Sequence, residues 1–406
     1  VSIEMARLFR QPLFLGLVDG RVHITRHDED WRIQTDSFRM SNADITTRSR
    51  FRIDVDAVSG IFVDAQTDFH DANAGNASQY LPVGIMGAGL VKWLDMAIVD
   101  GYVPAGSFLL HGQLKAFPYR KDEGVFQVHF QPRDASLKFL EDWPPLVEAN
   151  GRVRFENESL YVEDLTASTA DIRQLAGKAE IPDLFEAELH VEAGVSAANQ
   201  DLQSYVWNSP LDDILGNTLR LFQMQGESDL SLSLDIPLEA DKINVSLKGQ
   251  LGFRDAELYY PALGYELRSI NGSLEFTSKS LFADDIKAKI DGRDVVIDVL
   301  TYDIDDSSQV IFSLAGDMDI DHLAQRFDWI PADWLSGHSK WMFDIMVPYV
   351  PKDYQVRISA ASDLQGSVID ISDQVSKPAA GELTFTSTID ILENEGLQVK
   401  SMLKQG

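Results

Sequence analysis

Alternation of apolar and polar residues recurs along the chain and constrains its fold more strongly than any other feature. The longest run, Leu230–Ile236 (LSLSLDI), alternates over seven residues, and Phe126–Phe130 (FQVHF) follows the same rule. Because successive side chains of a β-strand point to opposite sides of the sheet, each run predicts a strand with one dry and one wet face. Parallel sheets covered by helices carry continuous apolar runs instead, so we predict a mostly β protein with antiparallel strands.

The apolar residues of these runs are the candidate functional residues, because alternation places those of one strand on a shared face. They are Phe126, Val128, Phe130, Val153, Phe155, Leu230, Leu232, Leu234, Ile236, Val245, Leu247, Leu251, Phe253, Leu274, Phe276, Ile286, Leu383 and Phe385. Alternation does not show what this dry face touches. Two arrangements therefore stay open: a sheet that curls around an open apolar trough, and a closed β-sandwich whose dry faces pack on each other.

Glycine, asparagine and aspartate interrupt the alternating runs, which is typical of hairpin turns. The predicted turns are at Asn150-Gly151, Gly226, Gly249, Asn271-Gly272, Asp291-Gly292 and Gly316.

Three short helices are predicted between the strands. Pro82–Val99 has apolar residues at three- and four-residue spacing, and its firm part is Leu90–Val99 because glycines weaken its first turns. A second helix is expected within Asn199–Gln225, and a third covers Ile320–Phe327. The residues expected at the centre of the second helix are Leu211, Ile214, Leu215, Leu219 and Phe222. We divide the chain into sections 1–120, 121–225 and 226–406, each containing one of these helices.

An internal repeat links two parts of the chain. Asn150–Ala167 aligns with Asn271–Ala288 at an offset of 121, with 7 of 18 positions identical. The shared unit is turn, strand, short turn, strand, and repetition of such units builds a sheet along one axis, as in solenoid-like proteins.

The charge balance excludes several kinds of partner. The chain has 35 basic and 64 acidic residues, a formal net charge of −29, and no cysteine. Phosphate binding requires clustered lysine and arginine, so we expect neither nucleic acid nor a polybasic contact with lipid head groups. An acidic exterior also limits self-association, which predicts a monomer. The chain starts at Val1 without a signal peptide, and its longest uncharged apolar stretch, Leu81–Val91, is too short to span a bilayer, so we expect a soluble section of a longer protein.

No group of residues in the sequence predicts catalysis, so we expect no enzyme, metal or cofactor. The eight histidines are scattered, without metal-binding spacing. The best metal candidates, Asp68–Asp71 and Asp317–His322, are interpreted as solvated strand faces of an acidic protein. The glycine-rich segment Gly84–Gly89 lacks the lysine and hydroxyl residue of a phosphate loop.

Several ordered motifs resemble the signature of the YhdP proteins, which belong to the AsmA-like group of large envelope proteins in Gram-negative bacteria, together with TamB. The motifs are Tyr80–Pro82, Trp93–Gly101 and Leu109–Tyr119, followed by Asp142–Leu146, the two repeats, Asp363–Gly366 and Lys377-Pro378. The resemblance covers most of the chain, from about Arg21 to Lys400.

This resemblance implies a bridge-like lipid transfer protein. In that group an elongated, twisted antiparallel sheet curls into an open groove lined with apolar side chains. The parent protein is anchored in the inner membrane by an N-terminal helix and crosses the periplasm, and phospholipid acyl chains slide along the groove towards the outer membrane. The present chain would then be a passive section of the conduit that supports the outer-membrane barrier. It would contact the inner and outer membranes only through parts of the parent that it lacks.

Two other functions are compatible with the same strands. A periplasmic scaffold or chaperone would assist outer-membrane protein assembly by pairing with strand edges. A closed β-sandwich would act as a glycan-binding module, with sugars stacked on tryptophans. The tryptophans available for this are Trp93, Trp143, Trp207, Trp329, Trp334 and Trp341.

Overall fold

A computed structural model describes most of the chain and divides it into two compact units. Residues 1, 5–8, 187, 213–219, 221, 239–244, 262–263, 305–306, 321–334, 351–352, 373–374, 393–395 and 405–406 lie outside the described part. Unit 1 contains residues 1–195 and 231–247, and unit 2 contains residues 196–230 and 248–406. Both units consist mostly of antiparallel β-strands, which confirms the predicted fold class.

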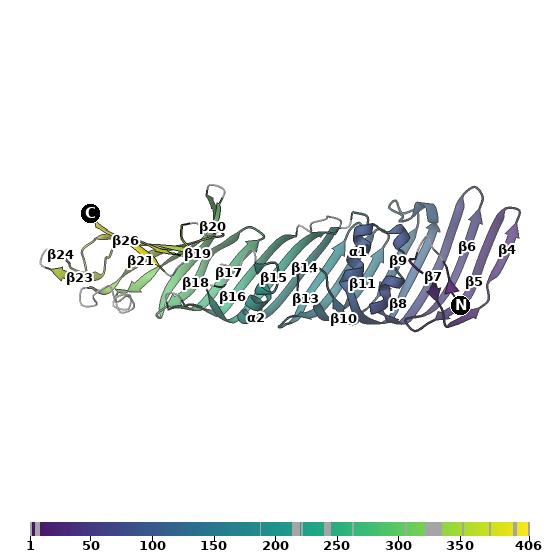
Figure 1. Cartoon of the computed structure of the whole chain (residues 1–406), viewed down its shortest axis with the longest axis horizontal. Helices are drawn as coiled ribbons and strands as arrows, with labels where there is room; N and C mark the ends of the chain where they lie inside the picture. The colour runs from purple at the N-terminus through teal and green to yellow at the C-terminus, as the bar shows by residue number, and fades with distance from the viewer. Residues whose placement is uncertain are drawn as a thin grey trace. The chain divides into compact units, whose positions relative to one another are not determined.

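Unit 1 is built on strands that follow each other in chain order (Figure 1). They are β1 (Ser2–Ile3), β2 (Leu13–Phe14), β3 (Leu17–Gly20), β4 (His23–His27), β5 (Asp30–Ser41), β6 (Thr46–Asp56), β7 (Gly60–Asn73), β8 (Ile98–Gln113), β9 (Val125–Phe130), β10 (Arg133–Leu137), β11 (Leu146–Glu156), β12 (Ser159–Thr169), β13 (Ile172–Ile181) and β14 (Glu188–Ala198). Its helices are η1 (Ala74–Gln79), η2 (Val83–Ile85), α1 (Ala88–Ala97) and η3 (Leu114–Ala116). Consecutive strands from β4 to β9 pair antiparallel, β9 pairs with β11, and β10 pairs with both β8 and β11.

Unit 2 repeats this construction, and α2 is the helix whose bounds lie within its described residues. The strands β15 (Gln223–Pro237) and β16 (Ser246–Tyr260) contain residues of both units. The remaining elements are α2 (Asn199–Trp207), β17 (Tyr265–Thr277), β18 (Leu281–Ile290), β19 (Arg293–Ile304), β20 (Ser307–Asp319), β21 (Leu335–Pro348), β22 (Val356–Ser362), β23 (Ser367–Ser372), β24 (Val375–Lys377), β25 (Thr384–Ile391) and β26 (Leu397–Lys404). Consecutive strands from β16 to β22 pair antiparallel, after which β22 pairs with β25 and β25 with β26.

Positive φ angles recur at the repeat offset at four positions in and around the two copies of the internal repeat. Four non-glycine residues with positive φ in unit 1 each have a counterpart with positive φ exactly one repeat, 121 positions, later in unit 2. The pairs are Asp134 with Asp255, Glu148 with Ser269, Asp164 with Asp285, and Ala170 with Asp291. The first three positions lie inside strands where the register shifts, so they mark β-bulges. The repeat therefore includes the bulges as well as the strands.

Most of the predicted turns are wrong, because these residues lie inside strands. Only Asp291-Gly292 joins two strands, β18 and β19. Asn150-Gly151 lies in β11 and Asn271-Gly272 in β17, where each asparagine side chain hydrogen-bonds the backbone of a bulge. Gly226, Gly249 and Gly316 lie in β15, β16 and β20. Glycine inside a strand suits a bulge or a close approach of a neighbouring strand, and a Cβ at Gly316 would lie 2.9 Å from the carbonyl oxygen of Asp294 on β19.

The helix predictions are confirmed in part. The firm part of the first helix corresponds to α1, which ends at Ala97 because Ile98 already begins β8. Within Asn199–Gln225 the structure has α2, which buries Leu202 and Tyr205 and ends at Trp207, just before an Asn-Ser-Pro sequence. Leu211 and Phe222 are outside any helix, while Ile214, Leu215 and Leu219 lie outside the described residues. Of Ile320–Phe327 only Ile320 is described.

Candidate functional site

Unit 1 carries a row of mainly apolar side chains that continues through nine paired strands. The register places these residues directly opposite one another, so they share one side of the sheet. From β5 to β14 the row is Met40, Thr47, Phe69, Gly106, Phe130, Val153, Val162, Ala179 and Val191. A parallel row two residues away is Phe38, Ser49, Thr67, Phe108, Val128, Phe155, Leu160 and Ile181. We call this side the apolar face of unit 1.

The opposite side of the same strands is polar and charged. The row one residue away is Arg39, Arg48, Asp68, Ser107, His129, Arg154, Tyr161, Glu180 and His190. His190 Nδ1 lies 2.7 Å from Asp235 Oδ1, which extends this polar side to β15. Near the end of β7, hydrogen bonds from Tyr102 and His70 hold the pKa of Asp71 below its usual range. Unit 1 thus separates apolar and charged side chains onto two sides of one layer.

Aromatic rings of the apolar face touch across strands without being fully buried. The ring centroids of Phe38 and Phe51 are 6.3 Å apart, and those of Phe69 and Phe130 are 6.5 Å apart. All four side chains are partly exposed. A closed sandwich buries the centre of such a face, whereas here apolar rings remain accessible between β5 and β9. The part of the sheet formed by β10 to β13 is more enclosed, with Ala149 and Ala167 buried in one apolar cluster.

Unit 2 has an apolar face of the same kind. From β18 to β26 one row is Ala283, Val299, Phe312, Ile345, Ile358, Ile389 and Val399. Phe222, which follows α2, packs on this face with its ring 5.4 Å from that of Tyr260 and 6.3 Å from that of Phe312. The ring of Trp341 stacks on that of Phe343, with 5.7 Å between the ring centroids. Phe222 therefore covers part of this face.

The second side of unit 2 departs from the expected wet face. Phe282 and Leu300 are cross-strand partners on that side and are 51% and 50% exposed. Leu300 pairs with Ile311, and Ile311 pairs with Met346, which extends the apolar row across four strands. The row becomes polar at β22, where Arg357 pairs with Asp390.

The structure brings the first group of predicted site residues together. Phe126, Val128, Phe130, Val153 and Phe155 lie next to each other on the apolar face of unit 1, on β9 and β11. In β15, Leu230, Leu232, Leu234 and Ile236 occupy alternate positions and become more buried towards Ile236, which is fully buried.

The remaining predicted residues divide between a sheet face and a core. Leu251, Phe253, Leu274, Phe276 and Ile286 lie on the apolar side of β16 to β18. Leu247 is buried at the start of β16, and Val245 precedes that strand.

Leu383 and Phe385, by contrast, pack against a buried cluster of Ile320, Leu364 and Ile369. For these two residues we infer a structural role.

The part of the apolar face that lies on β5 to β8 was not among the predicted residues. Ile53 pairs with both Ile33 and Val63, and Phe108 pairs with Val128. The signal was present, because Phe51–Val55 (FRIDV) alternates as strictly as the runs that were used.

The described residues contain no group of three side chains that could hold a metal ion. Asp317 and Asp319 lie on one side of β20, as predicted, opposite Lys340 and His338. The Oδ2 of Asp319 lies 3.5 Å from the Nη2 of Arg293. His322 lies outside the described residues.

In the part of the chain that the structure describes, none of the helices has the length and apolar character needed to cross a membrane.

Comparisons with known proteins point to one family. The family model described as YhdP protein matches residues 1–405. The chain is 26% identical over 344 residues to the protein named intermembrane phospholipid transporter YhdP from Escherichia coli strain K12. This match covers 82% of the chain and 26% of the relative, so the chain spans about a quarter of the curated relative it matches. No solved structure matches the chain.

Proposed function

Because this chain belongs to the YhdP family, we propose that it is a section of a periplasmic bridge along which phospholipids pass between the inner and outer membranes. The observation that carries the proposal is the mainly apolar row of unit 1, which continues through nine strands and keeps its aromatic rings partly exposed. The Escherichia coli relative is named as an intermembrane phospholipid transporter, which supports the same proposal.

The energetics of lipid transfer explain why such a face is needed. A diacyl phospholipid has roughly 30 methylenes, and exposing them to water costs on the order of 24 kcal/mol at about 0.8 kcal/mol each. An apolar sheet face that contacts the acyl chains throughout their passage removes most of this barrier. Weak, similar contacts along the face allow a lipid to move from one position to the next, and no catalytic group is required.

The two sides of unit 1 have different roles in this proposal. The apolar face contacts acyl chains, and the charged side keeps the section in water. The net charge of −29 disfavours adsorption of the section onto anionic membrane surfaces. Contact with both membranes is then made by other parts of the longer protein, including an anchor in the inner membrane.

Site-specific photocrosslinking tests this proposal. A benzophenone amino acid is placed at Val128, on the apolar face, and in a separate sample at His129, the next residue of β9 on the charged side. The full chain is purified from a Gram-negative host, irradiated and analysed by mass spectrometry. We expect phospholipid adducts at Val128 and at least tenfold fewer at His129, a ratio that corresponds to about 1.4 kcal/mol or more.

Three outcomes would contradict the proposal. Polypeptide adducts at strand edges, without lipid at Val128, would favour the scaffold for outer-membrane protein assembly. Equal lipid labelling at both positions would show that lipid does not distinguish the two sides. Saturable glycan binding by a lipid-free chain would favour the binding module.

A further inference from the structure

The second side of unit 2, opposite its apolar face, carries two apolar rows. One row contains Phe282, Leu300, Ile311 and Met346. The other lies four residues away along the same strands and contains Val296, Ala315 and Met342. Met342 is 56% exposed, and Val296 and Ala315 are exposed as well. We call these two rows together the outer patch of unit 2.

The outer patch has the character of an interaction surface. Single exposed apolar residues are common on monomeric proteins, whereas contiguous apolar patches mark sites where another molecule binds. The strands that carry the patch, β18 to β21, each pair with a neighbour on both sides, so their backbone groups are already hydrogen-bonded. The patch therefore offers side chains alone, and a partner cannot bind there by adding a strand to the sheet.

A polar row with two carboxylates separates the two apolar rows. It contains Asp298, Ser313 and Asp344, which are cross-strand partners on β19 to β21. The Oδ1 of Asp344 accepts a hydrogen bond of 2.7 Å from the Ser313 hydroxyl, and the Oδ1 of Asp298 accepts one of 2.9 Å from the backbone N–H of Asp285. These bonds position the two carboxylates, and neither carboxylate forms an ion pair with another residue that the structure describes. The centre of the outer patch is thus negatively charged.

The cations that adjoin the outer patch face other carboxylates. Lys287 is the cross-strand partner of Val296, and its Nζ lies 3.6 Å from the Oδ2 of Asp285. Arg357 is the cross-strand partner of Met346 and binds Asp390. Lys340, two residues from Met342 in β21, is opposite Asp317. The charge of Asp298 and Asp344 is therefore left for a partner to balance.

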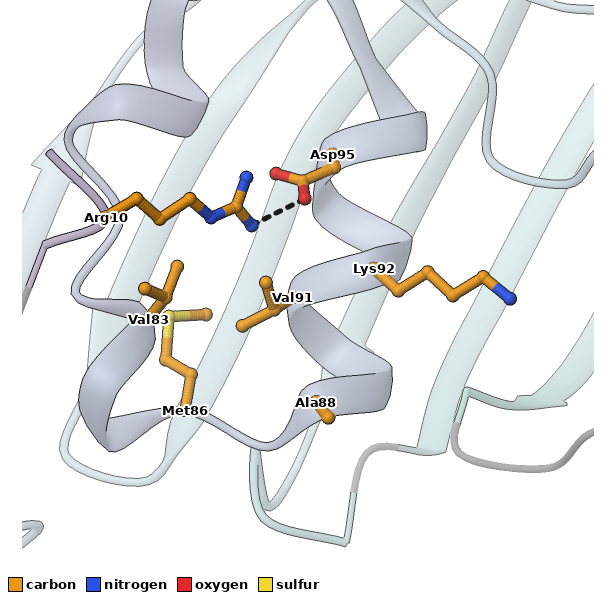
Figure 2. A pocket seen from close by; sticks show the side chains of 7 residues that line it. All are labelled: Arg10, Val83, Met86, Ala88, Val91, Lys92 and Asp95. Carbon is orange, nitrogen blue, oxygen red and sulfur yellow. Dashed lines mark hydrogen bonds and ion pairs between the residues drawn. The ribbon is translucent and has the colours of Figure 1, made fainter.

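A pocket in unit 1 shows the opposite arrangement of charge (Figure 2). It lies beside α1 and has a volume of about 460 Å³. Arg10 Nη2 lies 2.5 Å from Asp95 Oδ2, so these two charges balance each other, and Lys92 extends away from the cavity in Figure 2. The pocket thus presents no charge that would select an occupant, whereas the outer patch presents two.

The dimensions of the outer patch fit an α-helix. Two rows that are four residues apart along a strand are separated by about 13 Å, and an α-helix with its side chains is about 10 to 12 Å wide. Four strands spaced about 4.8 Å apart extend over roughly 14 Å, which about ten helical residues span. A helix also satisfies its own backbone hydrogen bonds, so side-chain contacts are sufficient to bind it.

We propose that the outer patch binds an amphipathic α-helix of a partner protein, in which a row of lysine or arginine is flanked by apolar side chains. The basic row meets Asp298 and Asp344, and the apolar flanks cover the two apolar rows. An anionic membrane surface and a second copy of the chain are disfavoured, because both are repelled by these carboxylates and by the net charge of −29. The patch lies on the other side of the strands from the apolar face, so this partner does not compete with lipid.

Two synthetic peptides test the outer patch. The first is an amphipathic helix of about 14 residues with a row of lysines between two rows of leucines, and in the second each lysine is replaced by glutamate. Fluorescence anisotropy measures the binding of each labelled peptide to the full chain at an ionic strength of about 0.15 M, where non-specific attraction is screened. We expect the lysine peptide to bind and the glutamate peptide to bind at least tenfold more weakly.

Variants of the chain locate the binding site. Leu300→Ser and Met342→Ser should each weaken binding of the lysine peptide about tenfold. Asp344→Asn removes the charge but keeps an acceptor for the Ser313 hydroxyl, and should weaken binding several-fold. The matched controls are Val58→Ser, at an exposed apolar position of unit 1, and Asp142→Asn, which makes the same change of net charge. Both controls should bind like wild type, and every variant should keep the wild-type content of co-purified phospholipid and the wild-type thermal midpoint.

Several results would overturn this assignment. Absence of lysine-peptide binding, or wild-type affinity of folded Leu300→Ser and Met342→Ser variants, would exclude the patch as the helix site. Equal weakening by Asp142→Asn and Asp344→Asn would show attraction to the whole acidic chain. Binding of phosphatidylglycerol vesicles that Met342→Ser abolishes would assign the patch to a membrane surface. A dimer in analytical ultracentrifugation that Met342→Ser dissociates would assign it to a second copy of the chain.

Discussion

Asn271 makes the same two side-chain hydrogen bonds in unit 2 that Asn150 makes in unit 1. The Nδ2 of Asn150 donates to the carbonyl oxygen of Glu148 over 2.7 Å, and its Oδ1 accepts from the backbone N–H of Asp134 over 3.3 Å. In unit 2 the Nδ2 of Asn271 donates to the carbonyl oxygen of Ser269 over 2.9 Å, and its Oδ1 accepts from the backbone N–H of Asp255 over 3.1 Å. Ser269 and Asp255 are 121 positions after Glu148 and Asp134. Each asparagine therefore joins a bulge in its own strand to a residue of the neighbouring strand.

Replacing either asparagine should weaken its unit. We expect Asn150→Ala and Asn271→Ala each to lower the free energy of unfolding by about 1 kcal/mol, because the bulge loses its side-chain hydrogen bonds. Denaturant titration monitored by circular dichroism measures the free energy of unfolding. Asn→Asp at each position keeps the acceptor but loses the donor, and should fall between alanine and wild type. Unchanged midpoints for both alanine variants would show that the bulges do not depend on these side chains.

A carboxylate on the apolar face should exclude lipid. Val128→Asp places a charge between Phe108 and Phe155, its partners on the neighbouring strands, where an acyl chain cannot compensate its desolvation. We expect several-fold less phospholipid to co-purify with the chain, measured by extraction and mass spectrometry, and the same direction for Leu232→Asp and Phe276→Asp. His129→Asp is the matched control on the charged side. Wild-type lipid content in a folded Val128→Asp variant would contradict the proposed conduit.

The ion pair between Arg357 and Asp390 should make the stability of unit 2 depend on pH. Two hydrogen bonds of 2.6 and 2.8 Å from the Arg357 guanidinium hold the pKa of Asp390 below its usual range. A lowered pKa contributes stability above the unfolded value of about 3.9, and this contribution is lost as the pH falls through the folded value.

We therefore expect Arg357→Gln to be about 1 kcal/mol less stable than wild type at pH 7. The difference should shrink as the pH falls below about 4 towards the lowered pKa of Asp390 in the folded wild type, because protonation removes the charge that Arg357 stabilises. Urea unfolding at several pH values measures the stability difference at pH 7 and its decrease at acidic pH. An equal difference at neutral and acidic pH would assign the effect to lost packing of Arg357 on the Tyr354 ring, whose centroid lies 4.2 Å away.

Gly106 should not tolerate a side chain. It is the cross-strand partner of Phe69, and a Cβ at this position would lie 2.5 Å from one ring carbon and 2.7 Å from the carbonyl oxygen of His129. Gly106→Ala should destabilise unit 1 by about 1 to 3 kcal/mol through overpacking, as measured by thermal unfolding.

Adding Phe69→Leu to the Gly106→Ala variant should restore part of the lost stability. The substitution removes the contact with the Phe69 ring, but the contact with the carbonyl oxygen of His129 remains. Gly252→Ala is the matched control, since the nearest atom to its added Cβ is 3.7 Å away. Equal effects of the two glycine substitutions would contradict the close-contact explanation.

The strands of the alternating runs and their apolar side could be predicted from local sequence. Alternation in Phe126–Phe130 and Leu230–Ile236 is a property of neighbouring residues, and the pleat of a strand converts it directly into two faces. The repeat at an offset of 121 was also visible, and its bulges reappear in the structure.

The sequence by itself determined that this protein is made of antiparallel strands with an apolar side, because that information is contained in successive residues. Only the tertiary structure decided which strands align, since Phe130 meets Val153 through a register that bulges and distant pairings determine. It likewise decided that Asn150-Gly151 forms part of a bulge and not a turn, because the residue that completes the bulge, Asp134, belongs to another strand. The row through nine strands, and the pocket between Arg10 and α1, exist only once residues far apart in the chain have come together.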